Sequence, residues 1–288
     1  MNNKKIEYNK TQKILNINSE KFIIKEKQKN IYSIYNYLDD IGFKNYLPIK
    51  STYKDYDVYP YIEEYNISKN DKAKKLIKII GKLHNKTITY EKINYNELYD
   101  EILQKLDYTY KYYYDLQDNI EDKQFMSPAE YLLIRNISSI YSLLNFSKNK
   151  IDEWYQLSKN KEKERHVLLN NNLNLYNYIY EKKDYIINWS NAKKGIVVYD
   201  FVYFFKHEYL NLDMYSLFKI YQQEFKYTEE EQKLFLSLIS IPKIVRLNKT
   251  NYLNTLNIRN LLLYIKYTHE FISKENEEKQ HTYEEKLK

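Results

Sequence analysis

The chain has 288 residues, of which 43% are hydrophobic and 17% aromatic, so it holds enough apolar side chains for a core and is not a disordered chain. It has no cysteine, which excludes disulfides, thiolate metal sites and a cysteine nucleophile. Its formal net charge of +7 permits an acidic partner such as nucleic acid, although the lysines are interleaved with glutamates along the chain.

The first 66 residues are predicted to be rich in β-structure. Residues 12–17 and 22–25 are two β-favouring runs that flank a polar turn, and this pattern predicts a hairpin. Residues 29–41 place apolar side chains at i, i+3, i+4 and i+7, which predicts a helix that ends at Gly42. Two more short strands are expected, at residues 48–53 and 58–65.

From residue 67 onward the chain is predicted to be mainly helical. Ser68, Ser127 and Thr228 each precede an acidic residue by three positions, which is the pattern of a helix N-cap. Residues 244–268 are expected to be largely helical, and the polar residues from Ser273 to the end are expected to fray. A short β element is predicted from three strand-like runs, at residues 178–180, 185–187 and 196–198.

A β-rich segment with one helix, followed by a helical segment with a short β element, is the element order of the bilobal kinase fold. Seven segments in this order resemble the aminoglycoside phosphotransferase and choline kinase group, and more closely the spore-coat kinase-like proteins of spore-forming Firmicutes. They are Phe22–Lys25, Pro60–Tyr65, Ile80–His84, Met126–Glu130, Leu169–Tyr178, Tyr185–Trp189 and Tyr199–Phe201. The resemblance implies an α+β, bilobal, protein-kinase-like fold. Its parts would be a β-rich lobe at 1–66, a helical lobe at 67–272 with the β element at 178–198, and a polar tail at 273–288.

The two segments that carry the chemistry in this family differ from the family pattern. The catalytic loop of active members reads His-Gly-Asp-Leu-His-x-x-Asn, whereas residues 170–177 read Asn-Asn-Asn-Leu-Asn-Leu-Tyr-Asn. The resemblance therefore places Asn172 where the family has the aspartate that accepts the proton of the attacking hydroxyl. It places Asn188 where the family has the aspartate that holds Mg²⁺. If the alignment is shifted by one residue in either direction, Asn171 or Leu173 takes the proton-accepting position instead of Asn172. None of these alignments therefore supplies an aspartate. The alternative is that residues 170–172 form an ordinary turn, which is rich in asparagine because a low-GC genome favours the AT-rich codons of that residue.

Four further residues complete the predicted site. The resemblance implies that Lys25 and Asn177 belong to a vestigial ATP and Mg²⁺ site, and the alternative for Lys25 is a solvated lysine at a strand end. His84 and Asp200 are predicted to be structural. No histidine pair or histidine–carboxylate pair has metal-ligand spacing, so no metal site is predicted. Residues 1–11 contain no glycine, so the family's phosphate-covering loop is predicted to be missing and the first lobe to be truncated.

These replacements predict a pseudokinase, a kinase-like protein that no longer transfers phosphate and has a structural or binding role such as spore-coat assembly. No cofactor is expected beyond weak binding of ATP and Mg²⁺, and the expected partners are other proteins of the coat or its assembly. One alternative is a slow or atypical ATP-dependent phosphotransferase that acts on a small-molecule or protein hydroxyl. Another is a binder of nucleic acid or of an anionic surface, which rests on the net charge alone.

The location of the protein is predicted from the absence of export and membrane signals. Residues 1–13 are mostly polar, and they are not followed by the hydrophobic region that a signal peptide requires. No run of apolar residues is long enough to span a bilayer. The chain is therefore expected to be cytoplasmic, or to lie in the spore coat if the family resemblance extends to location.

Overall fold

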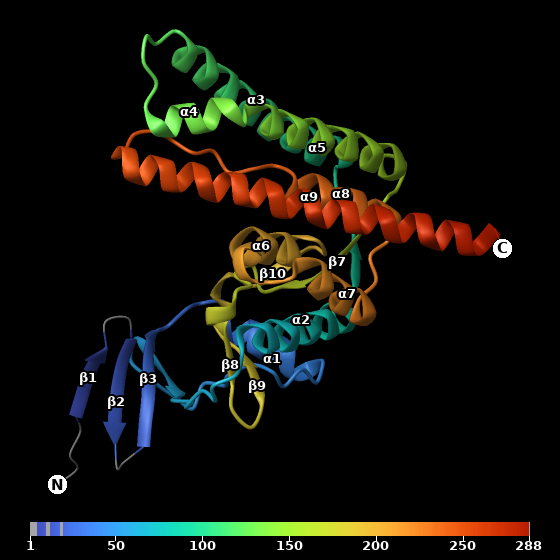
Figure 1. The fold of residues 1–288 in the computed structure, drawn as a ribbon. Helices are drawn as coiled ribbons and strands as arrows, with labels where there is room; N and C mark the ends of the chain where they lie inside the picture. The colour runs from blue at the N-terminus through green and yellow to red at the C-terminus, as the bar shows by residue number, and fades with distance from the viewer. Residues whose placement is uncertain (1–4, 10–11, 18–19, 288) are drawn as a thin grey trace.

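The structure is a computed structural model that describes residues 5–9, 12–17 and 20–287. Its first strands are β1 (Lys5–Asn9), β2 (Gln12–Ile17), β3 (Glu20–Glu26), β4 (Ser51–Tyr53) and β5 (Tyr56–Pro60). They form an antiparallel sheet in the order β1-β2-β3-β5-β4, at one end of the molecule (Figure 1). The predicted hairpin is confirmed by β2 and β3, and its turn residues Asn18 and Ser19 lie outside the described residues.

Two features of this sheet differ from the prediction. Strand β1 was not expected, because its sequence KIEYN is short and mostly polar and so gives little β signal. It pairs with β2 so that Asn9 lies opposite Gln12, and residues 10–11 lie outside the described residues. The strand predicted at residues 58–65 ends at Pro60, where the ring nitrogen has no hydrogen to donate to a neighbouring strand.

Helix α1 (Ile31–Asp40) follows β3 and packs on the sheet through one face. The buried residues are Ile31, Ile34, Tyr35 and Leu38, which confirms the predicted spacing. Gly42 ends the helix with a φ of +67°, a left-handed conformation that glycine adopts without strain. The amide of Gly42 donates to the carbonyl of Asp39, and the amide of Phe43 donates to that of Leu38, which satisfies the last turn of the helix.

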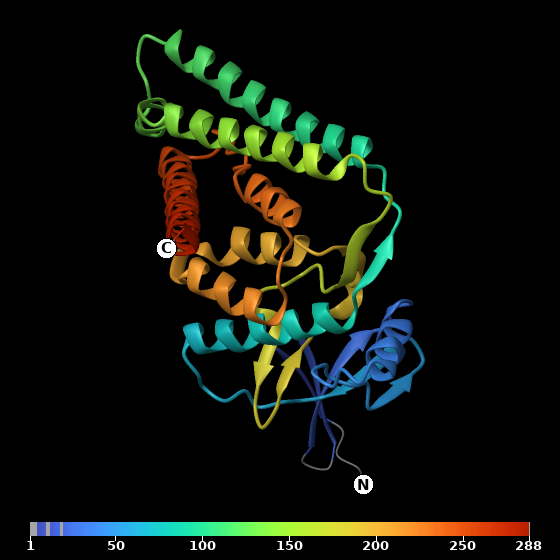
Figure 2. The ribbon, with the colours of Figure 1, turned by 90° about the vertical axis from the view of Figure 1, so that its right-hand side faces the viewer.

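The helical part of the chain begins after an irregular segment at residues 61–68. Its helices are α2 (Lys69–Lys86), α3 (Tyr95–Glu121), α4 (Pro128–Arg135), α5 (Ile137–Ser158), α6 (Tyr199–Glu208), α7 (Met214–Glu224), α8 (Glu229–Ile239) and α9 (Asn251–Leu287). The three predicted N-caps are confirmed, because the side chains of Ser68, Ser127 and Thr228 each accept a hydrogen bond from the backbone three residues later. Figure 2 shows α3 and α5 side by side at the end of the molecule opposite the first sheet.

Helix α9 corrects the prediction for the end of the chain, because it continues to Leu287 where fraying was expected from Ser273. Contacts with other helices explain the difference. The side chains of Phe271 and Ile272 are buried, and Glu278 accepts hydrogen bonds from Lys219 of α7 at 2.5 and 2.6 Å. The helix packs against α4, α5 and α7, and the contacts of Glu278 hold the first turns of the polar segment that follows Ser273.

The remaining strands form two small sheets within the helical part. A three-stranded sheet consists of β6 (Thr89–Glu91), β7 (Glu164–Leu169) and β10 (Lys193–Ile196), and a hairpin consists of β8 (Tyr178–Tyr180) and β9 (Asp184–Ile186). The runs predicted at 178–180 and 185–187 are confirmed by this hairpin. The third predicted run was wrong, because the strand lies at Lys193–Ile196 and pairs with β7, while residues 197–198 lead into α6. Strands β6 and β7 were not predicted.

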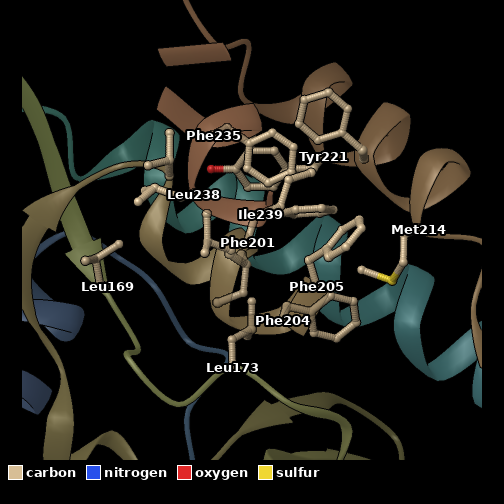
Figure 3. Close-up of a cluster of buried hydrophobic side chains, with 14 of the residues drawn as sticks. Leu169, Leu173, Phe201, Phe204, Phe205, Met214, Tyr221, Phe235, Leu238 and Ile239 are labelled. Carbon is tan, nitrogen blue, oxygen red and sulfur yellow. The ribbon is translucent and has the colours of Figure 1, made fainter. Parts of the chain in front are cut away.

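An aromatic core holds the helical part together (Figure 3). Phe201 of α6 contacts Phe218 and Tyr221 of α7 and Phe235 of α8, with ring centroids 5.3–5.6 Å apart. All four rings are at most 2% exposed, and their burial provides much of the hydrophobic stabilisation of this region. Phe204 and Phe205 of α6 are buried as well. In the described residues, no helix combines the length and the apolar character that crossing a membrane requires.

Candidate functional site

Lys25 lies on β3 and points toward the helical part of the chain. Its Nζ donates a hydrogen bond of 2.6 Å to Oδ1 of Asn188, which is 163 residues away in sequence. The same nitrogen lies 5.6 Å from the ring centroid of Tyr59, and burial lowers the pKa of Lys25. Asp57 is opposite Lys25 in the sheet, but its Oδ1 accepts a hydrogen bond of 2.5 Å from the hydroxyl of Tyr32. Within the described residues, Lys25 has no carboxylate at ion-pair distance.

Asn188 joins Lys25 to the loop that the sequence aligned with the catalytic loop. Its backbone is left-handed, with φ of 59° and ψ of 58°, a conformation that asparagine adopts more readily than most residues. Its Nδ2 donates a hydrogen bond of 2.5 Å to Oδ1 of Asn177. The next residue, Trp189, is fully buried and its Nε1 donates to the carbonyl of Ile186 at 2.8 Å, which fixes the segment on which Asn188 stands.

Asn172 and Asn177 are held within one loop. Nδ2 of Asn177 donates to the backbone carbonyl of Asn172 at 2.7 Å. Oδ1 of Asn172 accepts from Nδ2 of Asn174 and from the hydroxyl of Tyr203, both at 3.1 Å. The structure therefore brings together Lys25, Asn188 and Asn177 through their side chains, and it brings in Asn172 through its backbone.

His84 and Asp200 lie beneath this loop and are fully buried. The carboxylate of Asp200 accepts one hydrogen bond from the backbone N–H of Asn170 and one from the backbone N–H of Asn171, both at 2.8 Å. The His84 ring lies between Asp200 and Tyr221. Its Nε2 is 3.3 Å from Oδ2 of Asp200, and its Nδ1 is 2.7 Å from the hydroxyl oxygen of Tyr221. These contacts fix the backbone of the loop.

A cavity of about 250 Å³ lies where the first sheet meets the helical part, and it includes Lys25 and Asn188 in its lining. Most of the other lining side chains are aliphatic or aromatic, and they come from β3, α1, β5, the segment after β5 and the region of the β8–β9 hairpin. They include Ile23, Tyr35, Tyr59, Tyr61, Ile179 and Ile187. Tyr61 belongs to Pro60–Tyr65, one of the seven segments that carry the family resemblance. Tyr35 and Tyr59 were missed by sequence analysis, because only the packing of α1 on β5 brings them to the cavity.

The polar side chains around Lys25 are the neutral amides of Asn188 and Asn177, and the one carboxylate among the described residues of the cavity lining, Glu64, forms an ion pair with Lys72 at 2.6 Å. An amide is not a proton acceptor in the way that a carboxylate is, and Mg²⁺ in nucleotide sites is bound through carboxylates and phosphates. Among the described residues, no group of three or more histidine, aspartate or glutamate side chains is arranged to hold a metal ion. The arrangement can bind an anion through Lys25, but it offers no general base at residue 172 or 188.

Comparison with known proteins identifies the fold. A scan with protein-family models and a search of curated proteins gave no match to this sequence. The structure is similar to an aminoglycoside phosphotransferase from Alicyclobacillus acidocaldarius subsp. acidocaldarius DSM 446, with a TM-score of 0.73 and 8% identity, over 96% of this chain and 92% of that chain. It is also similar to the AMP-bound spectinomycin phosphotransferase APH(9)-Ia, with a TM-score of 0.58 and 15% identity, over 92% of each chain. The predicted α+β kinase-like fold, with a small N-terminal sheet and a mostly helical C-terminal part, is therefore confirmed.

Proposed function

We propose that this protein is a pseudokinase, which uses a kinase-like fold to bind other molecules and does not transfer phosphate. One observation carries the proposal: the side chains that meet between the first sheet and the helical part are Lys25, Asn188 and Asn177, with no carboxylate among them. Kinase-type transfer relies on one aspartate that accepts a proton and another that holds Mg²⁺. The family resemblance places those two roles at Asn172 and Asn188.

The loss of both carboxylates has a large expected effect on rate. General-base assistance alone contributes roughly 10²–10⁴ to the rate of a reaction. At position 188 the missing negative charge also weakens the binding of Mg²⁺, which normally neutralises charge on the transferred phosphate. In addition, Oδ1 of Asn172 already accepts hydrogen bonds from Asn174 and Tyr203, so the amide is held by the protein rather than free to orient a hydroxyl.

Weak nucleotide binding is compatible with this proposal. The cavity of about 250 Å³ has apolar walls suited to a flat ring, and Lys25 supplies a cation for phosphate. The solved structure of spectinomycin phosphotransferase that resembles this chain contains AMP. A phosphate that reaches Lys25 must compete with the hydrogen bond to Asn188, which is one reason to expect weak affinity.

The wider role that we propose is binding to other proteins, with spore-coat assembly as the leading setting and the cytoplasm or the spore coat as the location. The support is the sequence resemblance, in particular the helix start Met126–Glu130. Ser127 there forms a complete capping box with Glu130. The bounds of the two lobes, at residues 1–66 and 67–272, likewise remain a proposal that rests on the resemblance.

A slow or atypical phosphotransferase is the second candidate. One observation favours it: Lys25, Asn177 and Asn188 still meet although they come from three separate segments. Such an enzyme would need Mg²⁺ and would release ADP in the presence of an acceptor or of water. The two candidates therefore differ in the products formed from ATP.

The test measures ADP release and thermal unfolding with ATP, each with and without Mg²⁺. A ligand at about 100 times its Kd stabilises the native state by about 2.7 kcal/mol, which is easily measured. We expect no ADP above background and a small ATP-induced shift that does not need Mg²⁺. Lys25→Met should abolish this shift, and Lys27→Met, which removes an exposed lysine two residues away, should preserve it. Mg²⁺-dependent ADP release that is lost in Lys25→Met would overturn the proposal in favour of the enzyme.

A further inference from the structure

Two adjoining hollows on the helical part of the chain are lined by basic side chains. Their volumes are about 650 Å³ and about 680 Å³, and Lys206 and Lys243 line both. In the residues that the structure describes, neither hollow includes an aspartate or a glutamate in its lining. We call this surface the cationic groove and define it by Lys105, Lys193, Lys194, Lys206, Lys243 and Arg246.

The cations of the groove come from distant parts of the sequence. Lys105 lies on α3, Lys193 and Lys194 begin β10, Lys206 lies on α6, and Lys243 and Arg246 lie between α8 and α9. The fold therefore assembles the groove, and it is not the product of one lysine-rich segment.

These cations have few counter-ions of their own. Of the six, Lys194 is paired with Glu91 at 3.5 Å, and no ion pair of the other five is found in the described part of the chain. Many lysines elsewhere in the protein are paired, for example Lys150 and Lys219. A group of like charges without counter-ions is unfavourable, and a bound anion would relieve it.

Lys206 is the centre of this arrangement, because it lines both hollows. Its Nζ donates a hydrogen bond of 3.1 Å to the carbonyl of Ile241. Burial lowers the pKa of Lys206 to about 7, and the charges of Lys105 and Lys243 contribute. Lys105, Lys206 and Lys243 line the same hollow, and one multivalent anion in that hollow can contact all three.

We propose that the cationic groove binds a compact ligand that carries several phosphate groups. The cations line two hollows that share Lys206 and Lys243, and this clustering favours a compact polyanion over a nucleic-acid strand. The first hollow is also lined by Asn171 and by Tyr203, whose hydroxyl donates to Asn172. The ligand would thus lie beside the counterpart of the catalytic loop. It would not touch Lys25, so the proposal is independent of nucleotide binding in the cavity.

The experiment measures binding of inorganic tripolyphosphate to the full chain by calorimetry at low and moderate salt. The test variant is Lys105→Glu with Lys243→Glu. The control is Lys111→Glu with Lys148→Glu, which changes the net charge equally at exposed positions outside the groove, one of them on the same helix. Because reversed charges can impair folding, Lys206→Met is a second test variant, which removes an unpaired cation when binding is measured at pH 6.

We expect the test variant and Lys206→Met to weaken binding by about tenfold or more, which corresponds to about 1.4 kcal/mol. The control and Lys25→Met should change it by less than about twofold. Equal loss in the test and control variants would overturn the proposal, because binding would then reflect net charge alone. No binding of tripolyphosphate would also overturn it, as would a clear preference for a single-stranded DNA oligonucleotide over tripolyphosphate at equal phosphate concentration.

Discussion

Lys25 and Asn188 form a hydrogen bond of 2.6 Å between the first sheet and the helical part of the chain. It joins an ammonium group to a neutral amide at a position where an aspartate would form an ion pair. Asn188→Asp should therefore strengthen this contact and create a ligand for Mg²⁺. We expect an increase of about 1 kcal/mol in the free energy of unfolding at pH 7, measured with urea.

The same variant should gain a Mg²⁺-dependent component in its thermal shift with ATP, since a carboxylate at residue 188 would hold the metal against the phosphates. Asn145→Asp adds the same charge at an exposed site on α5 and serves as the control. If Asn188→Asp responds to Mg²⁺ and ATP as the wild type does, then residue 188 does not face the phosphates.

Asp200 is predicted to be essential for the stability of the loop that carries Asn172. Asp200→Asn removes a buried charge that accepts from two backbone amides and contacts His84, and it should destabilise the protein by about 3 kcal/mol. Asp213→Asn alters the exposed N-cap of α7, where asparagine is also a good cap, and should cost less than about 0.5 kcal/mol. Urea denaturation of the two variants gives the comparison. Similar losses would show that the contacts of Asp200 add little.

The aromatic core leads to a prediction about packing. Phe201 is fully buried against three other aromatic rings, so Phe201→Ala should cost about 3–5 kcal/mol. Phe125 is 81% exposed, and Phe125→Ala should change the free energy of unfolding by less than about 0.5 kcal/mol. Chemical denaturation measures both. A loss below about 1 kcal/mol for Phe201→Ala would contradict the packing described here.

The pKa of Lys206 predicts how stability depends on pH. In the folded protein this pKa is about 7, and in the unfolded chain it returns to about 10.5. Above pH 7 the unfolded chain therefore binds more protons than the native state, and the free energy of unfolding rises with pH. We expect a rise of about 2 kcal/mol between pH 7 and pH 9, below the range in which tyrosines ionise.

Lys206→Met isolates this contribution, because it removes the titrating group and leaves Lys25, whose pKa is also lowered, in place. The difference in unfolding free energy between the wild type and the variant should grow steadily from pH 7 to pH 9. A constant difference over that range would mean that Lys206 keeps an ordinary pKa in the folded state.

The site could be predicted from the sequence where its residues lie in short recognisable segments. Lys25 ends a β-favouring run, Asn188 precedes a tryptophan, and Asn177 follows an asparagine-rich loop, so each could be aligned with a family motif. The structure then places the three side chains in contact. By contrast, Tyr35 and Tyr59 carry no motif. They reach the cavity because α1 packs on β5, a contact that one sequence does not reveal.

Strand β1 was missed because its short polar sequence gives little β signal, but the other misassigned elements are stabilised by partners distant in sequence. Strand β7 pairs with β6 on one side and with β10 on the other, and neither partner lies within 20 residues of it. The part of α9 around Glu278 is polar but is held by contacts with Lys219 of α7. Local propensity is a weak guide wherever tertiary contacts supply most of the stability.

The left-handed backbone at Asn188 has a consequence for the history of this chain. Asparagine and aspartate both tolerate that conformation, so the exchange of one for the other leaves the path of the segment intact. Their codons differ by a single nucleotide. A single-nucleotide change at codon 188 would therefore place a carboxylate beside Lys25 without a change in the path of the backbone.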